Sequence, residues 1–576
     1  MSNFHHATIT CAVLLALGTG AAHAIDVIGA TNDNAEYSFY SRTNELRDSN
    51  LSNSKEHGQV VFVNGSATLN VTGGNTIVSG ATGIFANANS TVNISGKNTI
   101  KAASHAIYAN TNSKVTIVGE NAFEGSGDHV LFSNSSSSIS VDGNNVIRLT
   151  GDSYSGSALF TNGKSVMTFK GTNRVESTGG AFYSNAESSI VLVGDTTINV
   201  DDSAFYQNGQ NTKLTFVKGS TTTIEKASVG IYSAGQNAIE EGASVEIKQS
   251  EIGVQIYNKN TSIKVSGLLD VTSSGAGILT NSQGSVKESI AIDGGSLRVT
   301  STGTTSAIKS YQSNDVTVIA VRNSGTLEVD GTVDAYNGGF DLENSTATFS
   351  DLTLKGDLKA ADSTFNSGKF TNKGSMNLTD TVVTITGTEN GVSSMGKVTS
   401  DSSTFTLGKG KYTFTELNGN GNKISLNEVE PDKVVISSST DNSLTVTGTA
   451  NADDFASPQD YANALAQSVT SGDGSGKTVA NVIETPAGSV FGETSSKVED
   501  GVVVFNPEQY KPSEALSAYA DVIVLSAMTL RHEMNSLSKR MGELRDSPAG
   551  VGAWIRAYGS EMEYGHLGMT AKNNSL

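Results

Sequence analysis

The chain has 576 residues and carries 38 basic and 57 acidic side chains, which give a formal net charge of −19. An acidic surface gains nothing from counterion release, so nucleic acid is excluded as an expected partner. Charged residues make up 16% of the sequence and glycines number 61, so the composition is polar but weakly charged. Such a chain, unless disordered, is expected to consist of many short strands joined by tight turns.

Residues 1–24 have the features of a secretory signal peptide. A short apolar run begins at Cys11, and Ala22 and Ala24 form the small-x-small pattern of a cleavage site. The run is too short to span a bilayer. Cleavage is therefore predicted between Ala24 and Ile25, and it removes the only cysteine of the sequence.

A sequence repeat fills the middle of the chain. Similar segments begin at residues 61, 84, 107, 131, 159, 182 and 205, and weaker copies continue to 308. The mean spacing of about 25 residues is typical of solenoid proteins. Each copy contains alternating apolar residues, as in Val92 and Ile94, which predict strands with one buried face. Residues 61–450 are therefore predicted to form an all-β, right-handed parallel β-helix, and residues 25–60 its N-terminal cap or arm.

Asparagine recurs at one position of this repeat, two residues after an apolar–aromatic pair. Stacked at one corner of the coils, these amides can hydrogen-bond along the axis as a ladder. Asparagine also tolerates the left-handed backbone conformation that a tight corner requires. The predicted structural ladder consists of Asn64, Asn87, Asn110, Asn134, Asn162, Asn185, Asn208 and Asn281.

A column of aromatic residues accompanies the ladder. Regular aromatic columns usually serve packing, and this one is expected to stack along the solenoid axis. The column consists of Phe85, Tyr108, Phe132, Phe160, Tyr183, Tyr206, Tyr232 and Tyr257.

The character of the sequence changes after residue 450. All six prolines lie after residue 430, as expected if the amides of the preceding strands all join parallel ladders. Residues 451–512 are interpreted as a stalk or linker with one short helix, because Ser457 can act as N-cap before Pro458. Residues 513–546 are expected to form a long linker helix. Its leucine-rich stripe recurs at every seventh position, at Leu516, Ile523, Leu530, Leu537 and Leu544.

Residues 550–576 are expected to begin an outer-membrane β-barrel. Val551, Ala553, Ile555 and Ala557 alternate with a mixed set of side chains, as in a membrane β-strand. One such strand cannot close a barrel. The barrel is therefore expected to be truncated in this sequence.

The order of signal peptide, solenoid, helix and barrel strand resembles the type Va autotransporter family with a pertactin-like β-helix passenger. The segment RMGELRDSPAGVGAWIRAY is similar to the family's junction, in which R-M-G-E/D-L-R-D precedes G-x-W-x-R-x-Y. The matching residues are Met541, Gly542, Leu544, Arg545, Trp554, Arg556 and Tyr558. The resemblance implies export by the Sec translocon, insertion into the outer membrane by the barrel-assembly machinery, and a passenger at the cell surface or outside the cell.

The sequence assigns no catalytic residue, no cofactor and no metal ligand. His532 lacks the second histidine of a zinc-protease motif. A triad of Ser153, Asp152 and either His105 or His129 is conceivable, but Tyr154 stands where passenger serine proteases have glycine. A polysaccharide-active enzyme needs neighbouring carboxylates, and no stacked acidic column is expected in the repeats.

The predicted function is therefore that of a non-enzymatic, adhesin-like passenger that binds a host glycan, a matrix component or neighbouring cells. Two alternatives stay open. One is a β-helix enzyme, polysaccharide-active or protease-like, that is secreted by the same route. The other is a structural surface spacer or a self-associating protein.

Overall fold

The computed structural model describes Ala24 and residues 26–32, 34–151, 156–257, 261–281, 289–448, 455–485, 494–504, 511, 513, 517–528, 530–531, 560–566 and 569–575. The chain divides into two compact units. The first contains Met1–Gly387 and Ser393–Thr399, and the second contains Thr388–Val392 and Ser400–Leu576.

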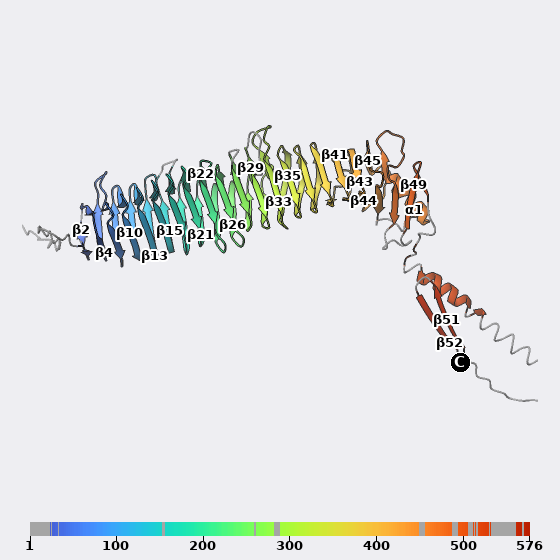
Figure 1. Ribbon diagram of the computed structural model, residues 1–576, viewed down its shortest axis with the longest axis horizontal. Helices are drawn as coiled ribbons and strands as arrows, with labels where there is room; N and C mark the ends of the chain where they lie inside the picture. Colours follow the sequence, from blue (N-terminus) through green and yellow to red (C-terminus); the bar gives the residue numbers. More distant parts are fainter. Residues whose placement is uncertain are drawn as a thin grey trace, which may run out of the picture. The chain divides into compact units, whose positions relative to one another are not determined.

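The first unit is a parallel β-solenoid whose coils stack along one axis (Figure 1). Each coil contributes strands to parallel sheets, which we call sheets I, II and III. The predicted all-β parallel solenoid is thus confirmed for this part of the chain.

Sheet I begins at the N-terminal end of the unit and continues through its later coils. It contains β1 (Asp26–Ile28), β4 (Thr43–Arg47), β7 (Thr68–Thr72), β10 (Thr91–Gly96), the first part of β13 (Lys114–Gly125), the first part of β15 (Ser138–Leu149), β17 (Val166–Phe169), β20 (Ser189–Leu192), β23 (Lys213–Phe216), β25 (Gln236–Ile239), β27 (Ser262–Val265), β30 (Ile290–Asp293), β33 (Val318–Arg322), β35 (Gly339–Glu343), β37 (Leu358–Ala361) and β39 (Ser375–Thr379).

Sheet II follows sheet I in each coil. It contains β2 (Thr31–Asn32), β5 (Asn50–Asn53), β8 (Thr76–Ser79), β11 (Thr99–Ala102), the ends of β13 and β15, β18 (Thr172–Ser177), β21 (Asp195–Val200), the first parts of β24 (Thr221–Ser233) and β26 (Ser244–Ile256), β28 (Leu268–Ser273), β31 (Ser296–Ser301), β34 (Thr326–Tyr336), β36 (Thr346–Leu354), β38 (Thr364–Asn372) and β40 (Val382–Ile385).

Sheet III completes the longer coils. It contains β3 (Tyr37–Phe39), β6 (Val61–Val63), β9 (Thr82–Ala86), β12 (His105–Ala109), β14 (Leu131–Ser133), β16 (Ser157–Thr161), β19 (Gly180–Asn185), β22 (Ser203–Asn208), the ends of β24 and β26, β29 (Ile278–Thr280) and β32 (Ile308–Ser310).

The core follows from the alternation along each strand. Inward side chains stack on their register partners one coil away, as in the column Val71, Ile94, Ile117, Val141 and Phe169 of sheet I, whose members are all 0% exposed. Because each partner is again apolar, the interior is a continuous column of apolar contacts. Residues 26–53, expected as a cap or arm, pair in parallel with the following coil.

The coil length changes sharply near residue 320. Ile290 pairs with Ile319, Ile319 with Phe340 and Phe340 with Leu358, so the coil length falls from 29 residues to 21 and then to 18. The sequence repeats weaken towards residue 308, and the register shows where the coils become shorter.

A column of glycines permits the close approach of the short coils. A Cβ on Gly356 would lie 2.0 Å from the carbonyl oxygen of Gly338, and a Cβ on Gly374 would lie 2.0 Å from that of Gly356. No side chain fits at these distances without moving the backbone.

Gly374→Ala is therefore expected to lower the free energy of unfolding by more than about 2 kcal/mol, since the adjoining backbone must shift. Gly74→Ala is the control, because its Cβ would meet nothing closer than 3.8 Å. Urea unfolding followed by circular dichroism measures both. Equal stability of the two variants would contradict the steric role of the column.

The second unit begins with further parallel pairs and ends with antiparallel ones. Its strands are β42 (Thr404–Leu407), β43 (Lys411–Asn420), β44 (Lys423–Leu426), β45 (Val434–Ile436), β46 (Thr445–Gly448), β47 (Val469–Ser471), β48 (Val482–Thr485), β49 (Thr494–Glu499) and β50 (Val502–Val504). β41 (Val392–Asp401) has residues in both units. β45 pairs with β47 and β46 pairs with β48 in parallel, whereas β48, β49 and β50 pair antiparallel.

The short helix α1 (Pro458–Ser468) lies among these strands. The Ser457 hydroxyl accepts a hydrogen bond from the backbone N–H of Asp460 and so caps the helix. Tyr461 and Leu465 are fully buried, and α1 contacts β46, β47, β48 and β50. The sequence interpreted residues 451–512 as a stalk or linker. In the structure α1 packs on β46, β47 and β48, which have parallel partners, and on β50, which pairs antiparallel.

The remaining described elements are a helix and a hairpin. Residues 517–528 and 530–531 are helical and Ser513 is not, while the other residues of the expected helix 513–546 lie outside the described residues. β51 (Ser560–His566) pairs antiparallel with β52 (Met569–Ser575). Of the expected barrel segment 550–576, the strand at 551–558 is not among the described residues. Among the described helices, none has both the length and the apolar character needed to cross a bilayer.

Candidate functional site

The outer side of sheet III carries a continuous column of aromatic side chains. Within each strand the aromatic residue points outward between two buried neighbours, as Tyr108 does between Ile107 and Ala109. We call this column the aromatic face. Its members are register partners and half-exposed: Phe62, Phe85, Tyr108, Phe132, Phe160, Tyr183, Tyr206 and Tyr232.

Most rings of the aromatic face stack on one another along the solenoid axis, but Phe160 and Tyr183 meet edge to face, at an interplanar angle of 68°. Ring centroids are 4.7 Å apart for Tyr108 and Phe132 and 4.4 Å apart for Tyr206 and Tyr232, with interplanar angles of 7° and 9°. Stacked rings contribute about 0.5–1.5 kcal/mol per pair beyond the buried area. Because the ring faces cover each other, the stack presents mainly ring edges and tyrosine hydroxyls to solvent.

The two ends of the column differ from the expectation. The sequence analysis did not include Phe62, whose ring centroid lies 5.3 Å from that of Phe85. The register partner of Tyr232 is Gln255, so Tyr257 lies two positions further along the chain. The ring of Tyr257 is still 5.5 Å from that of Tyr232, but it is tilted by 32° and 53% exposed.

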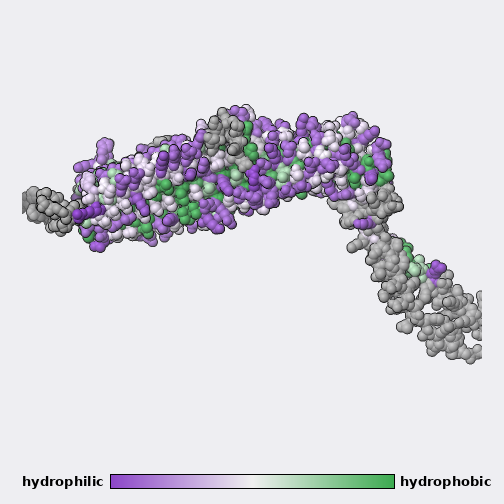
Figure 2. All heavy atoms as spheres, viewed as in Figure 1, coloured by the Kyte–Doolittle hydropathy of each residue, from purple (hydrophilic) through white to green (hydrophobic). Residues whose placement is uncertain are grey.

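The aromatic face is uncharged in a strongly acidic chain. None of its members, and none of the ladder asparagines beside it, carries a charge. Ion pairs join outward residues of the other two sheets, such as Lys101 with Glu124 at 2.9 Å in sheet II and Lys264 with Asp293 at 2.8 Å in sheet I. On the side of the molecule shown in Figure 2, hydrophilic residues dominate and apolar residues gather over the middle coils.

Two histidines pack into the aromatic face. The ring of His105 lies 5.4 Å from that of Phe132, and the ring of His129 lies 4.5 Å from that of Phe160. Burial, together with the neighbouring His129, lowers the pKa of His105 to about 4. Burial also lowers the pKa of His129, although a hydrogen bond to the Ser157 carbonyl and the Asp128 carboxylate oppose this shift. Both imidazoles are therefore neutral at pH 7.

The asparagine ladder lies beside the aromatic face. The Nδ2 of Asn87 donates to the Oδ1 of Asn64 at 3.2 Å, and the same bond links Asn110 to Asn87, Asn134 to Asn110 and Asn162 to Asn134 at 3.0–3.1 Å. This chain of amide bonds ends at Asn162 within the part of the solenoid that the structure describes. Further along, Asn208 donates to the Tyr183 hydroxyl, so the predicted ladder of Asn185, Asn208 and Asn281 does not continue the pattern.

The left-handed backbone conformation was expected at the ladder asparagines, but it occurs at other residues of the corner. It belongs to the residues that follow the ladder asparagines, such as Ala88 and Asn89, with φ of 51° and 63°, or Ser135 and Ser136. The asparagines therefore stabilise the corner through their amides, while their successors make the turn.

A second asparagine ladder is fully buried and was missed by the sequence analysis. The Nδ2 of Asn98 donates to the Oδ1 of Asn121 at 2.9 Å, and that of Asn121 donates to the Oδ1 of Asn145 at 3.0 Å. The backbone N–H of Asn98 adds a bond to the same Asn121 oxygen. The sequence pattern that could have predicted this ladder is an asparagine two positions after a glycine in the early repeats. The ladder consists of Asn75, Asn98, Asn121, Asn145 and Asn173.

One pair of carboxylates contradicts the expected absence of stacked acids. Glu246 and Asp270 are register partners on neighbouring coils of sheet II, followed by Arg298 and Glu328. Burial, with the nearby Glu246 and Glu328, raises the pKa of Asp270, and Arg298 opposes this. The pairing could not be read from the spacing of these two positions, because the coil lengths vary.

The other predicted site residues lie outside the described part of the chain. These are Ile25 at the cleavage site, Asp152 and Ser153 of the conceivable triad, His532, and the junction residues from Met541 to Tyr558. In the described residues, no three His, Cys, Asp or Glu side chains come together to hold a metal ion.

No known protein family and no curated protein matches the chain.

Proposed function

We propose that this chain is the passenger of an autotransporter, displayed at the bacterial surface, where its solenoid acts as a non-enzymatic adhesin. The observation that carries the adhesive role is the uncharged aromatic face, which runs without interruption from Phe62 to Tyr232. A protein with a net charge of −19 repels acidic cell surfaces, so an uncharged face is the part that can approach them at the least electrostatic cost.

The described helix supports the autotransporter part of the proposal. Within residues 517–531, Tyr519, Val522, Ile523 and Leu530 are each more than half exposed. Apolar side chains in such numbers on one short helix favour a covering partner. In an autotransporter this partner would be the wall of the barrel pore. Passengers of this family are right-handed β-helices. Connections between parallel strands are in general right-handed, so this handedness agrees with the general rule.

Changes to the aromatic face are expected to weaken adhesion. Tyr183→Ser combined with Tyr206→Ser should reduce attachment of displaying cells to host-cell monolayers by about tenfold, which corresponds to about 1.4 kcal/mol of lost contact. Val166→Ser is the matched control, because Val166 is an exposed apolar residue of sheet I outside the aromatic face.

Circular dichroism would establish that both variants keep the solenoid fold. Attachment by the double variant at the level of the control would contradict the role of the aromatic face. Loss of cell–cell clumping without any loss of host attachment would favour the self-associating alternative.

The enzyme alternative rests on Glu246 and Asp270. Glycoside hydrolysis uses a pair of neighbouring carboxyl groups, one of which has a raised pKa, as Asp270 has. If this alternative holds, a hydrolytic activity on polysaccharides should be lost in both Glu246→Gln and Asp270→Asn. If the adhesin proposal holds, neither variant should change attachment.

A further inference from the structure

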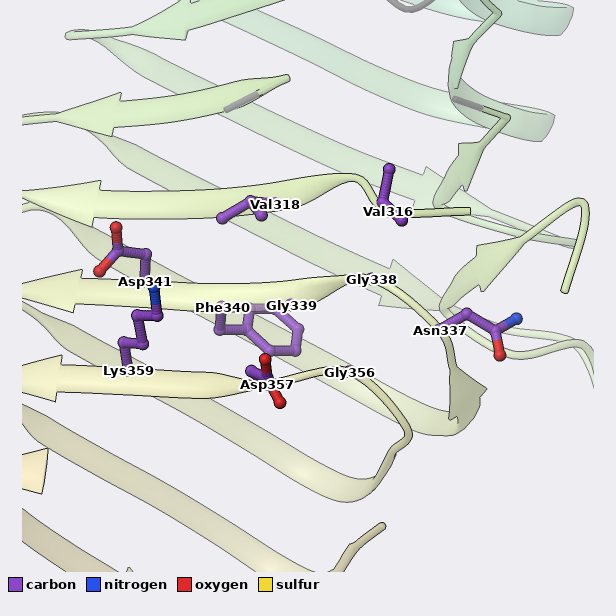
Figure 3. A pocket seen from close by; sticks show the side chains of 10 residues that line it. All are labelled: Val316, Val318, Asn337, Gly338, Gly339, Phe340, Asp341, Gly356, Asp357 and Lys359. Atoms are coloured by element: carbon purple, nitrogen blue, oxygen red, sulfur yellow. The ribbon is translucent and has the colours of Figure 1, made fainter. Parts of the chain in front are cut away.

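The step in coil length near residue 320 creates a hollow on the first unit. The hollow has a volume of about 680 Å³, within the range of small-molecule sites. It spans three consecutive coils, because Val318 is the register partner of Gly339 and Phe340 that of Leu358. We call it the shoulder pocket (Figure 3). Its lining residues include Val316, Val318, Gly338, Asp341, Asp357 and Lys359.

The roof of the shoulder pocket is held in place by buried hydrogen bonds. Val316 is 42% exposed, but its neighbours Asp315 and Thr317 are buried. The Asp315 carboxylate accepts bonds from the N–H and the hydroxyl of Thr317, and the Tyr336 hydroxyl donates to the Thr317 carbonyl at 3.0 Å. Thr280 also donates to Asp315. The pocket is therefore preformed, which reduces the entropy lost on binding.

The floor of the shoulder pocket is backbone. Gly338, Gly339 and Gly356 carry no side chains, and their backbone is bonded to neighbouring residues: the N–H of Gly339 donates to the Thr317 carbonyl at 3.0 Å. The Phe340 ring beneath them is 1% exposed. Val316 and Val318 add a small aliphatic wall (Figure 3). Because Phe340 is buried, the pocket offers aliphatic contacts rather than an aromatic platform.

The carboxylates of the shoulder pocket are held by neighbouring donors. Hydrogen bonds from the hydroxyl and N–H of Ser375, helped by Lys359, lower the pKa of Asp357. Asp341 forms an ion pair with Arg322 at 3.0 Å. Carboxylates held in this way can accept hydrogen bonds from hydroxyl groups, and the lowered pKa of Asp357 does not suit that residue to donate a proton. The arrangement suits binding rather than hydrolysis.

We propose that the shoulder pocket binds one unit of a neutral saccharide. Sugar hydroxyls both donate and accept, which matches the carboxylates of Asp341 and Asp357 and the ammonium group of Lys359 in one hollow, while the C–H side of the ring fits the valines. The net charge of −19 disfavours anionic sugars. This inference rests on the proposed adhesive function. It names a glycan as the class of ligand that the adhesin binds.

Saturation-transfer NMR on the purified full-length chain tests the proposal. The probes are the methyl glycosides of glucose, galactose and mannose, with sialic acid as the anionic comparison. At least one neutral glycoside should receive saturation with a Kd in the millimolar range, and the signal should fall at least fivefold in Asp357→Ala and in Val316→Trp, which fills the hollow.

Asp351→Ala is the matched control. The Asp351 carboxylate accepts a hydrogen bond from the backbone N–H of the following coil at Lys369, as Asp357 does at Ser375, but it lies outside the pocket. No transfer to any neutral glycoside, equal transfer in all variants, or preference for sialic acid would overturn the proposal. Because the measurement uses protein in solution, a failure here is distinguishable from a failure of surface display.

Discussion

Asn121→Ala is expected to destabilise the N-terminal coils more than any substitution on the outer surface of sheet I. Asn121 is 3% exposed, and its Oδ1 accepts from both the N–H and the Nδ2 of Asn98, while its Nδ2 donates to Asn145. Alanine removes a partner from each of these buried groups, at about 1–3 kcal/mol for each, although the Asn98 Nδ2 keeps its bond to the Ser95 carbonyl. The expected loss in the free energy of unfolding is about 4 kcal/mol.

Hydrogen exchange of the amides in residues 98–145 measures this loss locally, which matters because a solenoid can open coil by coil. The control is Asn93→Ala. Asn93 donates to Asn70 at 3.0 Å in the same way, but on the outer side of sheet I, where water can replace the lost bond. If the two substitutions had equal effects, the buried ladder would have no special role.

Stability is expected to fall as the pH decreases from 6.5 to 4 because of His105. Its pKa is about 4 in the folded protein, against 6.5 for a free histidine. In this window the unfolded chain binds a proton that the folded chain does not bind, so acid favours unfolding. The shift corresponds to about 3 kcal/mol, which is fully available above pH 6.5 and lost by pH 4.

His105→Gln should therefore flatten the dependence of the urea midpoint on pH between 6.5 and 4. Tyr108→Phe alters the same ring stack without removing an imidazole, and it should keep the slope of the original chain. A slope that is unchanged in His105→Gln would mean that other groups cause the acid sensitivity. The lowered pKa of His129 adds to the effect in the same direction.

The regular part of the fold could be predicted from the sequence because its signals are local. Alternation of apolar residues within a strand, as at Val92 and Ile94, predicts which side chains are buried. A nearly constant repeat length in the early coils predicts which residues of neighbouring coils stack on one another. The outer asparagines and the aromatic column from Phe85 to Tyr232 followed from these two signals alone.

The remaining features depend on register between coils, which the sequence does not state. Glu246 and Asp270 become neighbours only because the length of the intervening coil places one directly beside the other. The shoulder pocket arises from the change to shorter coils, and this change was visible in the sequence only as weaker repeats. The buried ladder at Asn121 was visible in the sequence as an asparagine two positions after a glycine. The sequence analysis did not distinguish this asparagine from the residues of the adjacent turn.

The helix α1 shows a different limit. Its N-cap at Ser457 and its apolar side chains Tyr461 and Leu465 were recognisable, and the structure has the helix where they predict it. What the apolar side chains pack against was not recognisable, because the contacts come from strands before and after the helix. The linker interpretation of residues 451–512 missed these contacts for that reason.

Surface display tests the central claim most directly. The chain would be expressed in front of a complete autotransporter barrel, and intact cells would be probed with antibodies to residues 61–300 before and after external protease. The account predicts a signal on intact cells that protease removes. A signal that appears only after lysis would contradict it, because the solenoid would then reside inside the cell envelope and could not act as an adhesin.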